Sequence, residues 1–332
     1  MGAQEYVVAA DLGGTLTKIG YGHADGSLTG VQRRSTFLHD GGDALLSWLA
    51  EQLIDVVDAR PADRCVGYGV VVPGIIEMGT GRVRAAPNVG WYDVPLRQRL
   101  TELTGLPGVV GHDVRSGGLA EWRLGSGVGV SNLLFLPLGT GIAGAMVVDG
   151  QLLDADGYAG EIGHLRVAAG ADTPCACGQV GCLETVASAA GVVRTYRALS
   201  GLAAVATAQD VAAAARAGEP AALKAFDLAT DALTEALTVY VTLLAPEVIV
   251  VGGGLSGAAD LFLAPLTAAV QQRLAFQRMP RIVPAALGAD AGLIGAGLAG
   301  WDAVRRSRGT AAAASSLATT APRLGADGGG HG

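Results

Sequence analysis

Three glycine-rich turns, each placed directly after a short apolar run, restrict the fold of this chain more than any other feature. They are DLGGT at 11–15, LGTGIAG at 138–144 and GGGLSG at 252–257. Glycine lets successive backbone N–H groups approach phosphate oxygens with no Cβ in the way. Each of them could equally be an ordinary tight turn. Together they indicate a protein that can hold phosphate groups at the ends of its strands.

Two common nucleotide-binding motifs do not account for these turns. The two later turns match the loose pattern G-x-G-x-x-G, which in a dinucleotide-binding fold requires a helix directly afterwards. After Gly144 the chain instead has the pattern of a strand and a turn, and a strand also follows the first glycine-rich turn. Neither lysine follows a glycine, which excludes a P-loop, and the H-R-D motif of protein kinases does not occur in the sequence.

Strand and helix patterns follow each other along the chain in a way that repeats once. Strand, glycine-rich turn and strand occur in each half, and the first three strands form a β-meander rather than a βαβ unit. Because 332 residues exceed the usual size of one domain, we predict two similar lobes that face a cleft. The apolar spacing predicts strands at 6–10, 16–21, 66–72, near 109, 133–138 and 248–251, and helices at 43–58, 116–124 and around 233–244.

Charge and hydropathy exclude several classes of protein. The net charge is −7 and only two lysines occur, so no basic patch is available for nucleic acid. Residues 1–10 do not have the pattern of a signal peptide, and no window reaches 18 uninterrupted apolar residues. We therefore expect a cytoplasmic protein that has neither a nucleic acid nor a membrane as its partner.

Three of the four cysteines lie close together and follow a histidine. Cys175, Cys177 and Cys182 fall within eight residues, and His164 precedes them. Three thiolates and one imidazole make a closed tetrahedral set that suits structural Zn²⁺, with no open position for a water. The alternative is a chance cluster of buried or redox-active cysteines. Cys65 lies in a predicted strand and is expected to be a small core residue.

The spaced motifs together resemble the ROK family of sugar kinases. Glu161-Ile162-Gly163-His164, followed by C-A-C-G-Q-V-G-C-L-E at 175–184, is similar to the signature of that family, and the three glycine-rich turns extend the resemblance over about residues 6–300. The resemblance implies a two-lobed α/β fold of the actin-like ATPase (ribonuclease H-like) type, with ATP and sugar in the cleft between the lobes. It places a smaller lobe at 1–113 plus about 291–306 and a larger lobe, with the zinc loop, at 114–290. The composition of residues 307–332 predicts a disordered tail.

The resemblance also assigns residues to the nucleotide. The first two turns would meet the β- and γ-phosphates of ATP and the third would meet the nucleoside, while Asp11 would orient hydrated Mg²⁺. The implied nucleotide-binding set is Asp11, Gly13, Gly14, Thr15, Lys18, Gly139, Thr140, Gly141, Gly253 and Gly254.

For the sugar, the resemblance implies a base and a set of hydroxyl-binding residues. Asp113 takes the position of the catalytic base that accepts the proton of the reacting hydroxyl, although an aspartate before a helix is also a common N-cap. The family has an asparagine where this chain has His112, which leaves the identity of the sugar open. The implied sugar-binding set is Gly74, Asn88, His112, Asp113, Glu161, His164 and Glu184.

These residues predict a hexose kinase that transfers the γ-phosphoryl group of ATP to the 6-hydroxyl of an aldohexose, glucose or N-acetylglucosamine. ATP, Mg²⁺ and structural Zn²⁺ are the expected cofactors, and the family resemblance implies a homodimer or a higher homo-oligomer. Two alternatives stay open at this stage. One is a sugar-sensing transcriptional regulator of the same family, and the other is a protein that binds sugar without catalysis.

Overall fold

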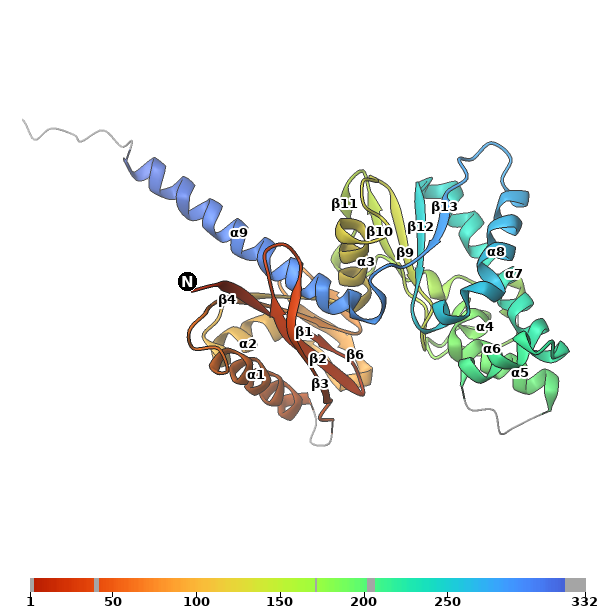
Figure 1. The fold of residues 1–332 in the computed structure, drawn as a ribbon, viewed down its shortest axis with the longest axis horizontal. Helices are drawn as coiled ribbons and strands as arrows, with labels where there is room; N and C mark the ends of the chain where they lie inside the picture. The colour runs from red at the N-terminus through yellow and green to blue at the C-terminus, as the bar shows by residue number, and fades with distance from the viewer. Residues whose placement is uncertain (1–2, 39–41, 171, 202–206, 320–332) are drawn as a thin grey trace, which may run out of the picture.

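The computed structural model describes residues 3–38, 42–170, 172–201 and 207–319. It is a mixed α/β structure built on two five-stranded sheets, which lie in two bodies on either side of helix α3 (Asp113–Leu124) and the start of helix α9 (Ala291–Thr319) (Figure 1). Each sheet has its own apolar core. The two lobes predicted from the repeated pattern are therefore matched by two sheets, while the lobe boundaries at 113 and 291 stay a prediction.

The first sheet has the spatial order β3-β2-β1-β4-β8. Its first three strands form the predicted antiparallel meander, and β4 and β8 then add in parallel. The strands are β1 (Glu5–Leu12), β2 (Leu16–Gly22), β3 (Leu28–Ser35), β4 (Arg64–Val72) and β8 (Gly108–His112).

Two helices and a small sheet complete the first lobe. Helix α1 (Gly42–Asp58) agrees with the prediction at 43–58 and buries its leucines in the core, because they recur at helical spacing. Helix α2 (Leu96–Thr104) and a three-stranded sheet were not predicted. That sheet contains β5 (Ile75–Glu77), β6 (Arg82–Ala86) and β7 (Trp91–Val94), and it brings Gly74 and Asn88 to the same edge.

The second sheet repeats the topology of the first, with the order β11-β10-β9-β12-β13. Strands β9 to β11 form an antiparallel meander, and β12 and β13 add in parallel. The same ends of corresponding strands therefore carry the glycine-rich turns. The strands are β9 (Leu133–Pro137), β10 (Ala145–Val148), β11 (Gln151–Leu152), β12 (Val248–Gly252) and β13 (Arg281–Pro284).

Helices α3 (Asp113–Leu124) and α9 (Ala291–Thr319) cross between the two sheets (Figure 1). Small residues make the crossing very close. A Cβ added to Gly295 would lie 1.9 Å from the carbonyl oxygen of Ser116, so no side chain fits there. The start of each helix is thereby fixed at the junction of the lobes. Helix α3 begins three residues earlier than predicted, at Asp113.

The remaining helices cover the second sheet. The predicted helix around 233–244 is the second half of a longer one, α7, which ends at Leu244 before Pro246. The loop between β11 and the next helix contains the predicted histidine and cysteines and three 3₁₀ turns, η2 (Ala155–Gly157), η3 (Ile162–His164) and η4 (Ala168–Gly170). The helices are α4 (Glu184–Ala187), α5 (Ala189–Ser200), α6 (Ala208–Arg216), α7 (Pro220–Leu244) and α8 (Ala259–Arg273).

The tail expected to be disordered from residue 307 is helical as far as the structure describes it, because α9 continues to Thr319. Residues 309–319 are rich in alanine, which has the highest helix propensity and extends a helix that is already formed. Residues 320–332 lie outside the described residues. Among the residues that the structure does describe, no helix combines the length and the apolar character needed to span a bilayer.

Candidate active site

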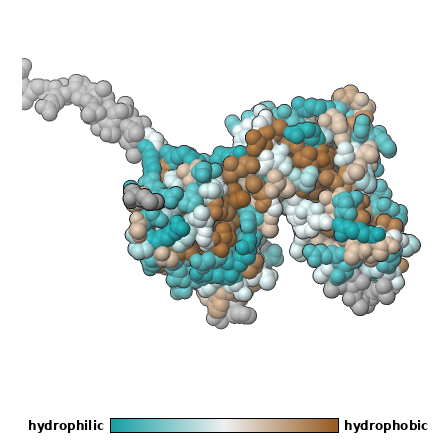
Figure 2. Space-filling view, in the orientation of Figure 1, coloured by the Kyte–Doolittle hydropathy of each residue, from teal (hydrophilic) through white to brown (hydrophobic). Residues whose placement is uncertain are grey.

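A cleft of about 780 Å³ lies between the two lobes, where the surface in Figure 2 is hollowed. It is lined from one side by the ends of β4, β6 and β8 and from the other by the glycine-rich turn after β9 and the loop that contains η3. All the residues predicted to bind sugar meet in it. They are Gly74, Asn88, His112, Asp113, Glu161, His164 and Glu184.

The start of α3 places Asp113 in this cleft. Its carboxylate accepts a hydrogen bond from the Val114 N–H at 2.7 Å, and burial raises the pKa of the carboxyl to about 6. The Asp113 side chain is thus an acceptor whose affinity for a proton is suited to acid–base chemistry near neutral pH.

The N-cap of α3 is His112, so the alternative of Asp113 as the cap is wrong. The Nδ1 atom of His112 accepts from the N–H groups of Val114 at 3.2 Å and Arg115 at 3.4 Å. Burial lowers the pKa of this imidazole to about 3. A neutral ring whose Nδ1 accepts must have its proton on Nε2, so His112 is a hydrogen-bond donor on its free side.

Asp11 is the residue before the last one of β1, near the start of α9, and it is not among the residues that line the cleft. Its Oδ2 atom lies 3.6 Å from Lys18 Nζ, which also lies 3.5 Å from Asp290 Oδ1 and donates to the carbonyl of Ala289. A Cβ on Gly292 would be 3.1 Å from Asp11 Oδ2, so glycine leaves room for this carboxylate. Burial raises the pKa of Asp11 to about 6, and the charge of Asp113 adds to the effect.

The first glycine-rich turn is tight and ends close to the cleft. The Gly13 N–H donates to the Leu16 carbonyl at 3.0 Å, and Thr36 donates through its hydroxyl to the Gly13 carbonyl at 2.7 Å. A Cβ on Gly14 would lie 3.9 Å from the carbonyl oxygen of Asn88, which lines the cleft. Thr15 completes the turn, and its carbonyl accepts from the Thr36 N–H.

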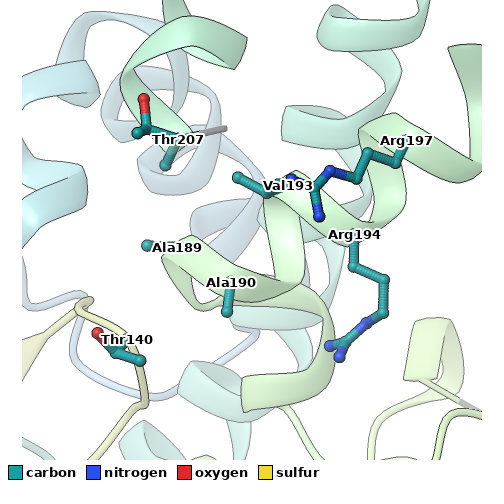
Figure 3. A pocket seen from close by; sticks show the side chains of 8 residues that line it. Thr140, Ala189, Ala190, Val193, Arg194, Arg197 and Thr207 are labelled. Carbon is teal, nitrogen blue, oxygen red and sulfur yellow. The ribbon is translucent and has the colours of Figure 1, made fainter. Parts of the chain in front are cut away.

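The second glycine-rich turn separates two cavities. Gly139, Thr140 and Gly141 line the interlobe cleft, and Thr140 also lines a neighbouring cavity of about 550 Å³. Figure 3 shows this second cavity, with Thr140 near Ala189 and Ala190 at the start of α5, and Arg194 and Arg197 farther along the same helix. Neither arginine was expected as a site residue.

The third glycine-rich turn lines neither cavity. Gly253 has φ +79°, and a Cβ there would lie 2.6 Å from the backbone of Leu138. The Leu255 N–H donates to the Leu138 carbonyl at 3.0 Å. Gly253 therefore supports the second turn from behind, because only glycine allows so close an approach of the two segments, whereas a Cβ on Gly254 would meet no atom within 4 Å.

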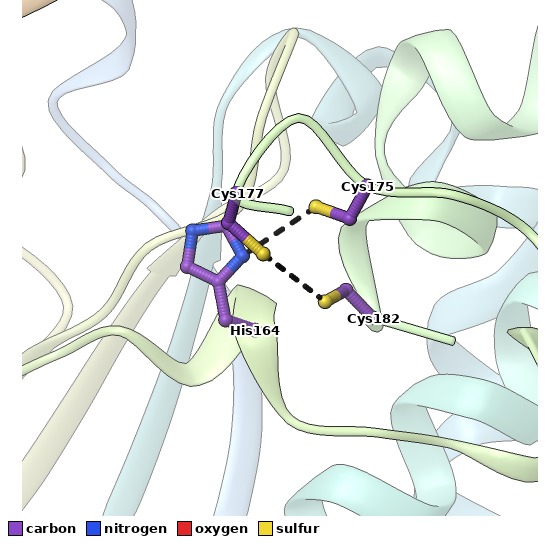
Figure 4. A group of neighbouring side chains, drawn as sticks. All are labelled: His164, Cys175, Cys177 and Cys182. Carbon is purple, nitrogen blue, oxygen red and sulfur yellow. Dashed lines mark hydrogen bonds between the residues drawn. The ribbon is translucent and has the colours of Figure 1, made fainter. Parts of the chain in front are cut away.

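His164, Cys175, Cys177 and Cys182 converge as predicted (Figure 4), with their ligand atoms all within 4.8 Å of one another. The Sγ atoms of Cys177 and Cys182 are 3.7 Å apart, and Cys175 Sγ is 3.7 Å from His164 Nδ1. Zn–S bonds of about 2.3 Å in a tetrahedron require sulfur atoms about 3.8 Å apart. The four residues thus have the chemistry and the spacing of a closed zinc site.

The imidazole of His164 links this cluster to the cleft. Its Nδ1 faces the cysteines, and its Nε2 lies 3.7 Å from Glu161 Oε2. Glu184 lies between the cluster and the second glycine-rich turn, because Oε1 accepts from Cys175 Sγ at 3.2 Å and Oε2 accepts from the Ile142 N–H at 3.4 Å. The cluster therefore contacts both Glu161, in the loop, and Glu184, at the start of α4.

Arg115 is a further residue that the sequence reasoning missed. It is only 2% exposed, on the same helical turn as Asp113. The available signal was a single charged residue within V-R-S-G-G-L-A, a segment otherwise composed of small and apolar residues. A charge in such a segment faces the interior, where it needs partners.

The fold and the cleft are those of a sugar kinase with an actin-like ATPase fold, since two sheets of the same topology enclose a cleft lined by carboxylates, imidazoles and the second glycine-rich turn. The model of the ROK family matches residues 7–299. This chain belongs to the ROK family, and its enzyme class is that of the ATP-dependent sugar kinases.

Known proteins agree with this assignment. A glucokinase of Halalkalibacterium halodurans is 37% identical over 89% of this chain and 94% of its own length. The ROK hexokinase of Thermus thermophilus has a TM-score of 0.77 at 30% identity, over 91% of this chain and 99% of that one. A ROK glucokinase of Streptomyces griseus in complex with glucose and AMPPNP has a TM-score of 0.75 at 26% identity over the same shares. Relatives also include an N-acetyl-D-glucosamine kinase and a xylose repressor.

Proposed function

We propose that the protein transfers the γ-phosphoryl group of ATP to the 6-hydroxyl of an aldohexose, glucose or N-acetylglucosamine. The observation that carries the proposal is the cleft itself. It brings Asp113, whose raised pKa suits a base, together with every other residue expected to bind sugar. Relatives named glucokinase and N-acetyl-D-glucosamine kinase support the two candidate sugars.

The sugar would be held between the lobes by groups of complementary chemistry. Glu161 and Glu184 accept hydrogen bonds from sugar hydroxyls, while the Nε2 atom of His164 acts as a donor because its Nδ1 faces the metal cluster. From the opposite side, Asn88 and His112 present further polar groups, and Gly74 leaves the backbone open to the ring.

Asp113 would act as the general base. It accepts the proton of the reacting hydroxyl as that oxygen attacks the γ-phosphorus, and the bond from phosphorus to the β,γ-bridging oxygen breaks to release ADP. The Val114 N–H keeps the carboxylate oriented through a hydrogen bond of 2.7 Å. Positioning of the two reactants supplies the rest of the catalysis, because phosphoryl transfer needs little covalent help from the protein.

We place the triphosphate at the second glycine-rich turn. Thr140 lines both cavities, so a γ-phosphate beside it would face the sugar while the nucleoside occupies the neighbouring cavity. Arg194 and Arg197 give that cavity a positive wall. Gly13, Gly14 and Thr15 would contact phosphate from the first lobe, and Lys18 would act through Asp11. Gly253 would shape the nucleotide site by supporting Leu138, and Gly254 would leave open space beside it for the nucleoside.

Two metal ions have distinct roles in this proposal. Asp11 would hold the hydration shell of Mg²⁺, which neutralises charge on the transferred group when it is bound. Structural Zn²⁺ on His164, Cys175, Cys177 and Cys182 would fix the loop that presents Glu161. The homo-oligomer and the cytoplasmic location stay predictions.

A coupled assay of ADP release tests the proposal. Wild-type protein with Mg²⁺-ATP is offered glucose, N-acetylglucosamine and N-acetylmannosamine in turn. Turnover on one of the first two supports the proposal and identifies the substituent at C2. A folded, zinc-loaded sample that binds a sugar but releases no ADP would contradict it and favour a sensor of sugar, as in the repressors of the family.

A further inference from the structure

Arg115 is a fully buried cation for which the proposed reaction has no use. It lies two residues after Asp113, in the first turn of α3, and is 2% exposed. Burying a guanidinium without partners is costly, so its contacts must offset the loss of hydration. Those contacts show what it holds together.

The guanidinium donates to carbonyl groups of two other segments. Nη1 donates to the carbonyls of Gly157 and Ala159 at 3.1 Å each, and Nη2 donates to the carbonyl of Ile76 at 3.3 Å. Ile76 belongs to β5 of the first lobe, and the other two acceptors belong to the loop after β11 in the second lobe. One side chain on α3 thus joins three segments that are far apart in sequence.

The loop that Arg115 holds has an unfavourable backbone conformation. Ala155 and Asp156 have φ values of +47° and +54°, in the left-handed region that residues other than glycine rarely adopt. Gly157 follows at φ +92°, and a Cβ there would lie 2.5 Å from the carbonyl oxygen of Ile76. Such a conformation persists only where its surroundings impose it, and the arginine contacts supply that restraint.

The same loop leads directly into the sugar-binding segment. Gly160 accepts a hydrogen bond of 2.7 Å from the Gly144 N–H, next to the second glycine-rich turn, and Glu161 and His164 follow. Arg115 donates a hydrogen bond to Ala159 and lies two residues after Asp113 in the same helix. The arginine therefore connects the base to the sugar-binding loop.

We propose that Arg115 is a positioning residue that sets the placement of the sugar-binding segment Glu161–His164 relative to the base Asp113. The inference rests on the proposed function and deepens it. Arg115 reaches neither substrate in this role. It fixes the position of the Glu161 carboxylate, which binds the sugar, and thereby the distance and angle between the reacting hydroxyl and the Asp113 carboxylate.

The charges around Arg115 are consistent with a role in tuning as well as in geometry. Its Nε atom lies 3.7 Å from Asp154 Oδ1, and neither atom has a hydrogen-bond partner. Asp113 and Glu161 are its other acidic neighbours. The positive charge of Arg115 lowers the pKa of Asp113, but burial raises that pKa by more. The negative charge of Asp113 in turn raises the pKa of Asp11 on β1.

The test compares Arg115→Met and Arg115→Lys with wild type and with Arg123→Met, a control on the same helix whose arginine pairs with Asp302 at 2.7 Å, outside the cleft. We expect both Arg115 variants to raise the KM for the sugar by about tenfold and to lower kcat by about tenfold to a hundredfold, with the KM for ATP within about twofold. The control should match wild type.

The pH profile separates a positioning role from general loss of structure. Without the cation, the carboxyl of Asp113 binds its proton more tightly, so the acid limb of kcat should move to higher pH in Arg115→Met. In Arg115→Lys the charge remains, and the limb should stay near its wild-type position although the KM for the sugar is raised.

Two results would overturn the inference. One is an unchanged KM for the sugar in Arg115→Lys, the variant that decides the matter if Arg115→Met does not fold. The other is a parallel rise of the KM values for sugar and ATP. Calorimetric measurement of sugar binding keeps the two proposals apart. If the wild type binds sugar without turnover, the kinase proposal fails. The positioning role of Arg115 would still predict a sugar Kd about tenfold higher in Arg115→Lys than in wild type.

Discussion

Two opposite walls of the cleft are held in place by different means. On one wall, the start of α3 is fixed by packing against α9 and by hydrogen bonds that end on His112 and Asp113. On the other, the loop that presents Glu161 and His164 has few strands or helices of its own. It depends on close glycine contacts, on Arg115 and on the cluster of one histidine and three cysteines for which we propose a zinc ion.

This difference predicts how each wall fails. A wall held by packed helices keeps its shape when one polar group is changed, so substitutions there should affect the chemical step. A loop held by a metal loses its shape when a ligand is removed, because binding of structural zinc supplies about 10 kcal/mol or more. Substitutions there should affect sugar binding first.

The sharpest test of the packed wall is Asp113→Asn. We expect kcat to fall by about 10²- to 10⁴-fold because the base is lost, while the KM for the sugar stays within a few-fold. Steady-state kinetics of ADP release measure both constants. Asp43→Asn, at an exposed carboxylate of α1, is the matched control and should be silent. Normal turnover by Asp113→Asn would remove the base from the proposal.

The wall with the proposed zinc site is tested by Cys177→Ser, at the most exposed of the four proposed ligands, where loss of packing is smallest. We expect the zinc content to fall from one per chain and the KM for the sugar to rise by about 10- to 100-fold, since the loop loses its cross-link. Elemental analysis and kinetics report the two effects. Cys65→Ser changes the cysteine outside the cluster and should keep the metal. An unchanged zinc content in Cys177→Ser would refute the ligand set.

The pH dependence of activity should reflect the titration of Asp113, on the wall formed by the start of α3. Burial raises the pKa of Asp113 to about 6, and the base works only when it is deprotonated. Activity should therefore rise with pH through about 6 and be about tenfold lower at pH 5 than at pH 7. A profile of kcat/KM from pH 4.5 to 8.5 measures it, with the zinc content checked at each end. Because Asp11 titrates in the same range, the midpoint belongs to the coupled pair. An acid limb with its midpoint below pH 5 would contradict the raised pKa.

The smallest effect is expected at His112, which caps α3. Asparagine is a good N-cap, so His112→Asn should change the free energy of unfolding by well under about 1 kcal/mol, whereas His112→Ala should cost about 1 kcal/mol. Chemical denaturation compares the two variants. Equal losses in both would show that the Nδ1 contacts do not stabilise the helix. The same pair, assayed on glucose and N-acetylglucosamine, reports whether the imidazole contributes to the choice of sugar.

Much of the fold and the site could be predicted from local sequence. Apolar runs followed by glycine gave the strand ends, the spacing of His164 and three cysteines gave the metal cluster, and the motif resemblance gave the cleft residues. Each of these depends on interactions between residues close in sequence or on a fixed ligand chemistry. The helix at 307–319 was missed because its composition suits both a flexible tail and the extension of an existing helix.

Other properties were decided only by the tertiary structure. Arg115 contacts Ile76 and Ala159, and Gly253 packs against Leu138, although these residues are far apart in the sequence. The N-cap of α3 is His112 and not Asp113. None of these contacts can be read from local sequence, because each depends on how distant segments or neighbouring side chains are placed in space. The sequence alone determined which chemistry is present, because residue types and short spacings fix donors, acceptors and ligands. Only the tertiary structure decided which of these side chains line the same cleft, because long-range packing brings them together. It also decided their pKa values, because burial and neighbouring charges shift them.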